Sequence, residues 1–185
     1  MDKKKKEKKL QEVAVEILSC KECKIDRVGV AVVGEGSSDA KVVFIGEAPG
    51  KTESEVGRPF IGRSGKLLRM LIVNAGLKEE DVYITSPVKY LPTYITPKPS
   101  DIAHGKTHLD KQLDAIDPQY IVLLGNVAIQ GVLGRKMAAM TEHGNVIKEK
   151  NRTYFLTIHP AAAIRFQKFR KVIEGDFTKL KGLLK

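Results

Sequence analysis

The chain has 185 residues, of which 42% are hydrophobic and 29% charged, so it can bury a hydrophobic core but is too short for two large domains. Lys and Arg number 32 against 22 Asp and Glu, and the formal net charge of +10 favours a polyanionic partner such as nucleic acid, although solubility explains the same balance. The 2 cysteines form no disulfide framework, and no apolar run approaches the roughly 20 residues of a membrane span. We therefore expect a cytoplasmic protein with no membrane partner.

Residues 1–9 contain a run of lysines whose mutual repulsion predicts a basic disordered tail or the frayed start of a helix. Such a tail is either simply solvated or loosely attracted to phosphate. Apolar residues then recur at helical spacing from Leu10 to about Cys20 and predict the first helix. Residues 10–185 are expected to form a single domain, and the chain is expected to be a monomer.

Cys20 and Cys23 form a C-x-x-C pair at the end of this helix. This is the spacing of half a zinc or iron–sulfur site, or of a thioredoxin-type redox pair, but a closed metal site needs four ligands and the sequence has no further cysteine. His104 and His108 are able in principle to complete a mixed site, although nothing in the local sequence places them there. The alternative is a pair of semi-buried thiols.

The apolar run Val42–Ile45 is typical of a central strand that is covered on both faces, and a short strand or edge segment is expected before it at 30–33. The stretch from Gly46 to Gly65 is rich in Gly and Pro, which predicts a tightly turned loop. Open α/β sheets place their sites at the carboxyl ends of strands, so this loop, with Glu47 and Phe60 in it, is the first candidate site.

A helix is predicted over 64–75, and Arg63 and Lys66 flank its start. Exposed backbone N–H groups, the positive end of the helix dipole and these two cations converge there and indicate a phosphate site. The nearby GEAPGKT is not a nucleotide-binding P-loop, because too few residues separate its glycines and the helix begins much later.

The rest of the chain alternates strands with helices. Strands are predicted at 81–88, 119–125, 145–150 and 153–158, an irregular loop at 89–99, and helices at 100–113, 126–133 and from about Ala162, the last with the apolar stripe Phe166, Phe169, Ile173, Phe177 and Leu180. This alternation predicts a three-layer α/β/α sandwich with a mainly parallel central four-stranded sheet. His159, after the last strand, is either structural or faces the same cleft as Glu47, because parallel strands end at one edge of a sheet.

Five segments, in this order, resemble the type-4 uracil-DNA glycosylases: GEGSSDAKVVFIGEAPG, GRPFIGRSGKLL, DVYIT, YIVLLG and HPAAAIR. The similarity extends from Cys20 to the final helix. It implies an enzyme that flips uracil out of single- or double-stranded DNA and breaks its N-glycosidic bond to leave an abasic site. It also implies base excision repair of DNA in the cytoplasm, in association with the nucleoid.

The resemblance assigns a role to each matching residue. Glu47 corresponds to the acid that positions or activates water against C1′, and His159 to the histidine that donates to uracil O2. Phe60 corresponds to the aromatic that stacks on the base, which Gly46 and Ala48 also contact. The residues that would hold the neighbouring phosphates or fill the gap in the duplex are Gly62, Arg63, Ser64, Gly65, Ile164 and Arg165.

Two departures from the family pattern matter. The family holds a 4Fe-4S cluster on four cysteines; Cys20 and Cys23 match the first pair, but Tyr90 and Gly105 stand where the later pair falls, so we expect no cluster and no other cofactor. Ser86 stands where the family has an Asn whose amide reads the uracil edge, and a hydroxyl cannot span both edges. Ser86 is therefore either a weaker base contact or a plain turn residue. The alternatives to a monofunctional uracil-DNA glycosylase are a glycosylase for another deaminated base and an inactive DNA-binding relative.

Overall fold

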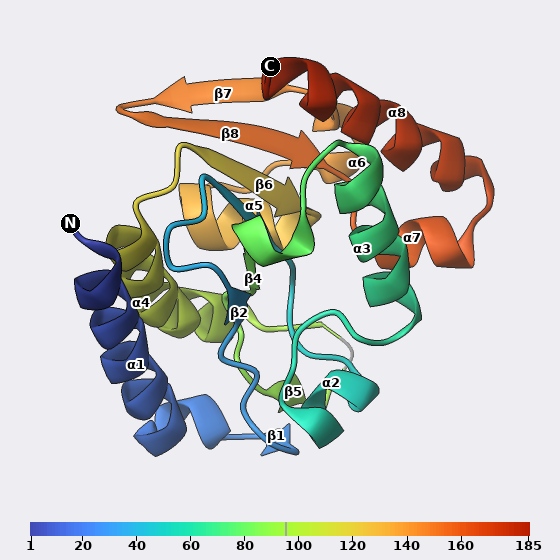
Figure 1. The fold of residues 1–185 in the computed structure, drawn as a ribbon. Helices are drawn as coiled ribbons and strands as arrows, with labels where there is room; N and C mark the ends of the chain where they lie inside the picture. The colour runs from blue at the N-terminus through green and yellow to red at the C-terminus, as the bar shows by residue number, and fades with distance from the viewer. Residues whose placement is uncertain (95) are drawn as a thin grey trace.

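The computed structural model describes residues 1–94 and 96–185, and its centre is one six-stranded sheet (Figure 1). The strand order is β2 (Glu35–Gly36), β4 (Val82–Thr85), β3 (Val42–Ile45), β6 (Tyr120–Leu124), β8 (Arg152–Thr157) and β7 (Val146–Glu149). The central four strands are parallel, while β2 and β7 pair antiparallel at the two edges. The predicted four-stranded sheet is therefore wrong in strand number, because it corresponds to the parallel centre alone.

Strand β3 lies at the middle of the parallel centre because every one of its side chains is apolar. All four are buried, and Phe44 is in register with Ile84 of β4 on one side and Val122 of β6 on the other. The parallel direction brings the carboxyl ends of β3, β4, β6 and β8 to the same edge of the sheet. The loops that follow these strands build the candidate site.

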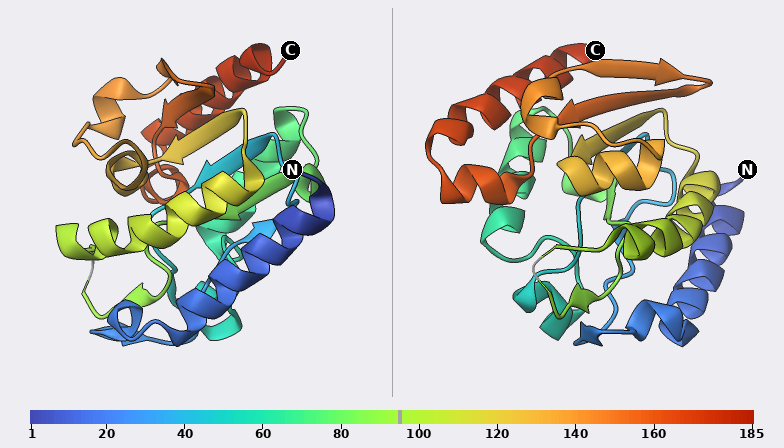
Figure 2. Two further views of the ribbon diagram at one scale, coloured as in Figure 1. Left: turned by 90° about the vertical axis from the view of Figure 1, so that its left-hand side faces the viewer. Right: turned by 180° about the vertical axis from the view of Figure 1, so that it is seen from behind.

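Helices cover both faces of the sheet, so the predicted α/β/α sandwich is confirmed (Figures 1 and 2). One face is covered by α3 (Arg63–Asn74), α7 (Pro160–Arg165) and α8 (Lys168–Leu183). The other is covered by α4 (Pro99–Ile116), α5 (Asn126–Leu133) and α6 (Ala139–Glu142), and α1 (Lys3–Ser19) packs on the outside of α4. The rings of Phe44 in β3 and Phe177 in α8 stack with centroids 6.0 Å apart.

Helix α1 begins at Lys3, so the residues predicted as a disordered tail over 1–9 are almost all helical. Asp2 caps the helix by accepting a hydrogen bond from the backbone N–H of Lys5. Lys6 Nζ donates to the carbonyl of Ile116 over 2.8 Å and lies 3.1 Å from Asp39. Because Ile116 ends α4, this ammonium sits at the negative end of that helix's dipole, which holds the basic segment in place.

Three further expectations are corrected. Residues 30–33 form no strand; the N–H of Val30 donates to Ser54 and that of Val32 to Lys89, outside any ladder. The final helix is broken into α7 and α8, because Phe166 adopts an extended conformation and leaves the core, 46% exposed. The glycine-rich loop contains a helix, α2 (Lys51–Val56), whose ends are Gly50 and Gly57.

The remaining elements are short. The two-stranded ribbon of β1 (Arg27–Val28) and β5 (Leu91–Pro92) lies apart from the main sheet, and 3₁₀ turns occur at η1 (Glu22–Lys24) and η2 (Glu79–Asp81). None of the helices in the described ranges is long and apolar enough to cross a membrane.

Candidate active site

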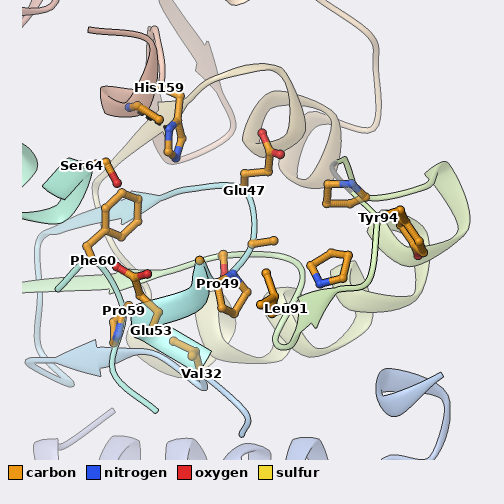
Figure 3. A pocket seen from close by; sticks show the side chains of 16 residues that line it. Val32, Glu47, Pro49, Glu53, Pro59, Phe60, Ser64, Leu91, Tyr94 and His159 are labelled. Atoms are coloured by element: carbon orange, nitrogen blue, oxygen red, sulfur yellow. Dashed lines mark hydrogen bonds between the residues drawn. The ribbon is translucent and has the colours of Figure 1, made fainter. Parts of the chain in front are cut away.

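A cavity of about 260 Å³ opens at the carboxyl edge of the parallel strands (Figure 3). Its walls come from the segments that follow β3, β4 and β8 and from the turn before α3. Figure 3 shows the rings of Phe60 and His159 together, with the Glu47 side chain apart from them. Six of the sequence-predicted site residues line this one cavity: Glu47, Ala48, Phe60, Ser64, Ser86 and His159.

The Phe60 ring is held in place by an unusual backbone and by two glycines. Phe60 has φ of +51°, a left-handed value that is uncommon for a residue with a Cβ. A Cβ on Gly46 would lie 2.5 Å from Cζ of the Phe60 ring, and a Cβ on Gly65 would lie 2.0 Å from the Phe60 carbonyl oxygen. The predicted base contact Gly46 thus packs against Phe60, and Gly65 is buried beneath its backbone. The ring centroids of Phe60 and His159 are 5.8 Å apart.

Glu53, which the sequence reasoning missed, fixes the turn that carries Phe60. It lies in α2 with 9% of its surface exposed, and its Oε1 accepts hydrogen bonds from the N–H groups of Ile61 (3.0 Å) and Gly62 (2.8 Å). Both bonds close the turn between Phe60 and the start of α3. Gly50 and Gly57 bound the helix that contains this acid, and they were the signal in the sequence. The segment between them was predicted as part of a loop instead.

Replacing Gly65 by Ala tests this packing. The new methyl group would collide with the Phe60 carbonyl, so the free energy of unfolding is expected to fall by about 2–4 kcal/mol. Urea unfolding followed by circular dichroism measures this loss. Gly175→Ala in α8 is the matched control, because a Cβ there meets nothing within 4 Å and should stabilise the helix by about 0.5–1 kcal/mol. Equal stability of the two variants would show that the Phe60 turn is not tightly packed.

Glu47 carries the free carboxylate of the cavity. Among the described residues, none forms a hydrogen bond or ion pair with its side chain, in contrast to Glu53. Burial raises the pKa of the Glu47 carboxyl above its ordinary value. A half-buried acid without a partner costs stability when it is ionised, which is typical of a group kept for chemistry.

His159 is a neutral hydrogen-bond donor toward the cavity. Burial lowers the pKa of its imidazole to about 4, so the ring is uncharged at neutral pH. Its Nδ1 accepts a hydrogen bond from the N–H of Ala161 over 3.1 Å and caps α7. Nδ1 is therefore unprotonated, and the single ring proton is on Nε2. Nε2 lies on the Gly46 side of the ring, 3.7 Å from where a Cβ of Gly46 would be.

Ser86 lines the cavity, but its hydroxyl donates a hydrogen bond within a turn of the backbone. The side chain is 6% exposed, and Oγ donates to the carbonyl of Val88 over 2.8 Å. Its oxygen can still accept a hydrogen bond from a ligand, whereas its proton is not free to be donated. Ser86 is therefore a turn residue that also lines the cavity, and its contact with a base stays a prediction.

A shallow groove next to the cavity holds most of the predicted phosphate contacts. It is lined by Gly62, Arg63, Ser64, Ile164 and Arg165, together with Thr52, Glu53 and Ala161. Ser64, Glu53 and Ala161 line both the groove and the cavity, so the two are continuous. Arg63 and Arg165 are exposed, and Arg165 lies over the ring of Phe166.

Away from this cavity, the structure brings Cys20 and Cys23 against α4. His104 and His108 stand there one helical turn apart, and one ligand atom from each of the four residues lies within 4.8 Å of the others. The sequence named all four residues but did not place the histidines beside the cysteines. The signal was present, since C-x-x-C and H-x-x-x-H are both metal-ligand spacings.

Comparisons with known proteins find one matching family and several similar chains. Residues 33–179 match the model of the family described as the uracil DNA glycosylase superfamily. The chain is 38% identical to the type-4 uracil-DNA glycosylase of Sulfurisphaera tokodaii over 94% of its length and 84% of that protein. It is 39% identical to the type-4 enzyme of Saccharolobus solfataricus, over 93% of this chain and 85% of the relative. Identity to the type-4 enzyme of Thermotoga maritima is 35%, with 97% of each chain covered.

Proposed function

The chain belongs to the uracil-DNA glycosylase superfamily and within it to the type-4 family, and we propose that it hydrolyses the N-glycosidic bond of uracil in DNA at the cavity lined by Glu47, Phe60 and His159. It is an N-glycosyl hydrolase by family. We further propose that the base is flipped out of the DNA and that an abasic site remains without strand cleavage.

One observation carries the proposal: a carboxylate with no hydrogen-bond partner among the described residues, a neutral imidazole with its proton on Nε2 and an aromatic ring all line one cavity. An everted uracil can stack on the Phe60 ring, which contributes on the order of 1–3 kcal/mol to holding the base out of the duplex. This gain offsets part of the few kcal/mol that unstacking and unpairing cost.

The chemistry follows from the charges that develop as the bond breaks. The C1′–N1 bond breaks with its electron pair passing to the base, so the sugar becomes oxocarbenium-like and the uracil oxygen becomes negative. His159 Nε2–H donates to that oxygen, and the Glu47 carboxylate stabilises the cationic sugar and orients the water that adds to C1′. The water's proton goes to Glu47 or to the departing base.

The groove beside the cavity is proposed to bind the DNA backbone. Arg63 at the start of α3 and Arg165 at the end of α7 supply positive charge, and the helix start adds the backbone N–H groups that follow Gly62, whose own N–H donates to Glu53. Ile164 lines the same groove, and we propose that it fills the space that the flipped base leaves. We also propose that the enzyme is cytoplasmic and associated with the nucleoid.

Neutralising the two arginines tests the groove. The double variant Arg63→Gln and Arg165→Gln is expected to lower the slope of log K against log salt by about 1–2, because each phosphate contact contributes about 0.7–0.9. Fluorescence anisotropy with a uracil-free oligonucleotide measures the slope. Arg135→Gln is the control, since Arg135 pairs with Glu149 of the edge strand over 2.6 Å and is not in the groove. An unchanged slope in the double variant would place the DNA elsewhere.

The pH profile tests the assigned protonation states. The Glu47 pKa is raised by burial and the His159 pKa is lowered to about 4, so Glu47 is the last of the two to lose its proton as the pH rises. Because the carboxylate is the active form, kcat/KM should rise through the Glu47 pKa, above the ordinary carboxyl range, and then stay flat through neutrality. Rates measured between about pH 4 and pH 8 should rise once, through the Glu47 pKa, and should not fall near the ordinary histidine pKa of about 6.5. A fall there would mean that His159 acts as a cation.

Release of free base from oligonucleotides with uracil, hypoxanthine or xanthine tests the function itself. We expect uracil release and alkali-labile abasic sites. The Ser86 hydroxyl already donates its proton to Val88, and the family's Asn amide, which would donate to the base edge, is missing here. This favours one second candidate, a glycosylase for another deaminated base. Faster release of hypoxanthine or xanthine than of uracil would select that candidate. Binding of the oligonucleotides with no base release would contradict both.

A further inference from the structure

Two segments far apart in the sequence bring four metal-binding side chains together outside the active site. Cys20 follows α1 and Cys23 lies in η1, while His104 and His108 are on one face of α4. Each offers one ligand atom, and these atoms lie within 4.8 Å of one another. We propose that this Cys2His2 cluster is a structural zinc site.

Two sulfur–nitrogen distances are close to those around a single tetrahedral ion. Cys20 Sγ lies 3.2 Å from Nε2 of His104, and Cys23 Sγ lies 3.4 Å from the same nitrogen. Zinc bonds of about 2.3 Å to sulfur and about 2.0 Å to nitrogen separate tetrahedral ligand atoms by about 3.3–3.8 Å. Two thiolates and two neutral imidazoles balance the charge of the divalent ion, so the complex is neutral, which suits a site that is partly buried.

The histidines are oriented as metal ligands. Nδ1 of His104 lies 3.2 Å from Glu22, and Nδ1 of His108 lies 3.3 Å from Glu16, so each imidazole turns its other nitrogen away from a carboxylate. Carboxylates commonly lie beside the second nitrogen of zinc-bound histidines. His108 is only 3% exposed, and neither ring nitrogen forms a hydrogen bond within the described part of the chain. A buried imidazole nitrogen needs a partner, and a bound metal ion would supply one.

The 4Fe-4S cluster of the family does not fit these residues. A cluster places iron and sulfide atoms between its ligands and needs them farther apart than atoms that all lie within 4.8 Å. Gly105 stands at one of the missing cysteine positions, and a Cβ there would lie 2.1 Å from the carbonyl oxygen of Pro87. Tyr90, at the other, is buried against Cys23. The backbone thus leaves no room for a thiol at position 105.

A metal at this point connects the N-terminal helix to the wall of the cavity. The segment after Cys23 forms β1, whose Arg27 pairs with Asp101 of α4 over 2.6 Å and donates to the Tyr94 hydroxyl over 2.7 Å. Tyr94 lines the active-site cavity, and its hydroxyl donates in turn to Asp101. Zinc would therefore hold α1, η1 and β1 against α4 in the position that this wall requires.

Metal content of the purified full chain tests the site without any use of activity, so its outcome is independent of the proposed glycosylase function. We expect about one zinc per chain and no iron or sulfide. Cys23→Ser and His104→Asn should each lower zinc to less than about a tenth of this value, whereas His143→Asn, which alters a histidine paired with Asp176 outside the cluster, should retain it.

Cobalt titration of the metal-stripped wild-type chain covers the case in which the variants fail to fold. Co²⁺ in a Cys2His2 tetrahedron should give intense visible bands and sulfur-to-metal charge transfer, and Zn²⁺ should displace it at one equivalent. Iron and sulfide in comparable amounts with brown colour, or a chain that binds neither Zn²⁺ nor Co²⁺, would overturn the proposal.

Discussion

Glu47→Gln is expected to slow uracil release by about 10²–10⁴-fold, because the amide cannot stabilise a cationic sugar or accept a proton from water. The substitution keeps the size of the side chain and its place in the cavity wall. Single-turnover assays with excess enzyme measure the chemical step, and binding to the same oligonucleotide should change little. The loss should therefore appear in kcat rather than in affinity.

The stability of Glu47→Gln should not fall, in contrast to its rate. Because burial raises the Glu47 pKa in the folded chain, the folded state holds this proton more tightly than the unfolded state does, so the free energy of unfolding falls as the pH rises through that pKa. At neutral pH, Glu47→Gln removes this penalty and should melt no lower than the wild type. Glu55→Gln, on the exposed side of α2, is the matched control and should change neither property. A fully active Glu47→Gln would remove this carboxylate from the mechanism.

His159→Ala should reduce the single-turnover rate by about 10²–10³-fold, since it removes the Nε2–H donor that faces the developing negative charge on the base. It also removes the cap of α7, at a cost of about 1 kcal/mol of stability. The rate at saturating enzyme separates the chemical loss from any loss of folded protein.

His159→Asn separates the two roles within the site. An Asn side chain can still cap α7 by accepting from Ala161, but it does not extend as far into the cavity. We expect it to restore stability while remaining slow. His143→Asn, outside the cavity, should react at the wild-type rate. If His159→Asn matched the wild type in rate, the imidazole would be a structural cap and not a donor to the base.

Much of the fold could be read from the sequence because its signals are local. The run Val42–Ile45 is apolar throughout and forms β3, and the helix predicted over 126–133 is α5 with the same bounds. The failures arise where tertiary contacts decide. Residues 1–9 are rich in lysine, yet Lys6 reaches the end of α4 and extends α1 over nearly all of them. The short edge strand β2 has no periodicity to reveal it.

The candidate site was predictable in its conspicuous residues only. Glu47 and His159 follow apolar strands, and the parallel sheet brings strand ends to one edge, so their place in one cavity could be expected before any coordinates. Their catalytic roles stay predictions. Glu53 was missed because its partners, the N–H groups of Ile61 and Gly62, carry no sequence signature. The pairing of Cys20 and Cys23 with two histidines more than 80 residues away depends on how α1 packs on α4.

The most direct measurement is a crystal structure of the chain with DNA that contains 2′-fluoro-deoxyuridine, whose fluorine disfavours the cationic sugar and slows cleavage. The account predicts uracil stacked on Phe60, its O2 within about 2.7–3.2 Å of His159 Nε2, and C1′ facing the Glu47 carboxylate. A uracil that stays in the duplex, or one bound with Glu47 turned away from C1′, would contradict it.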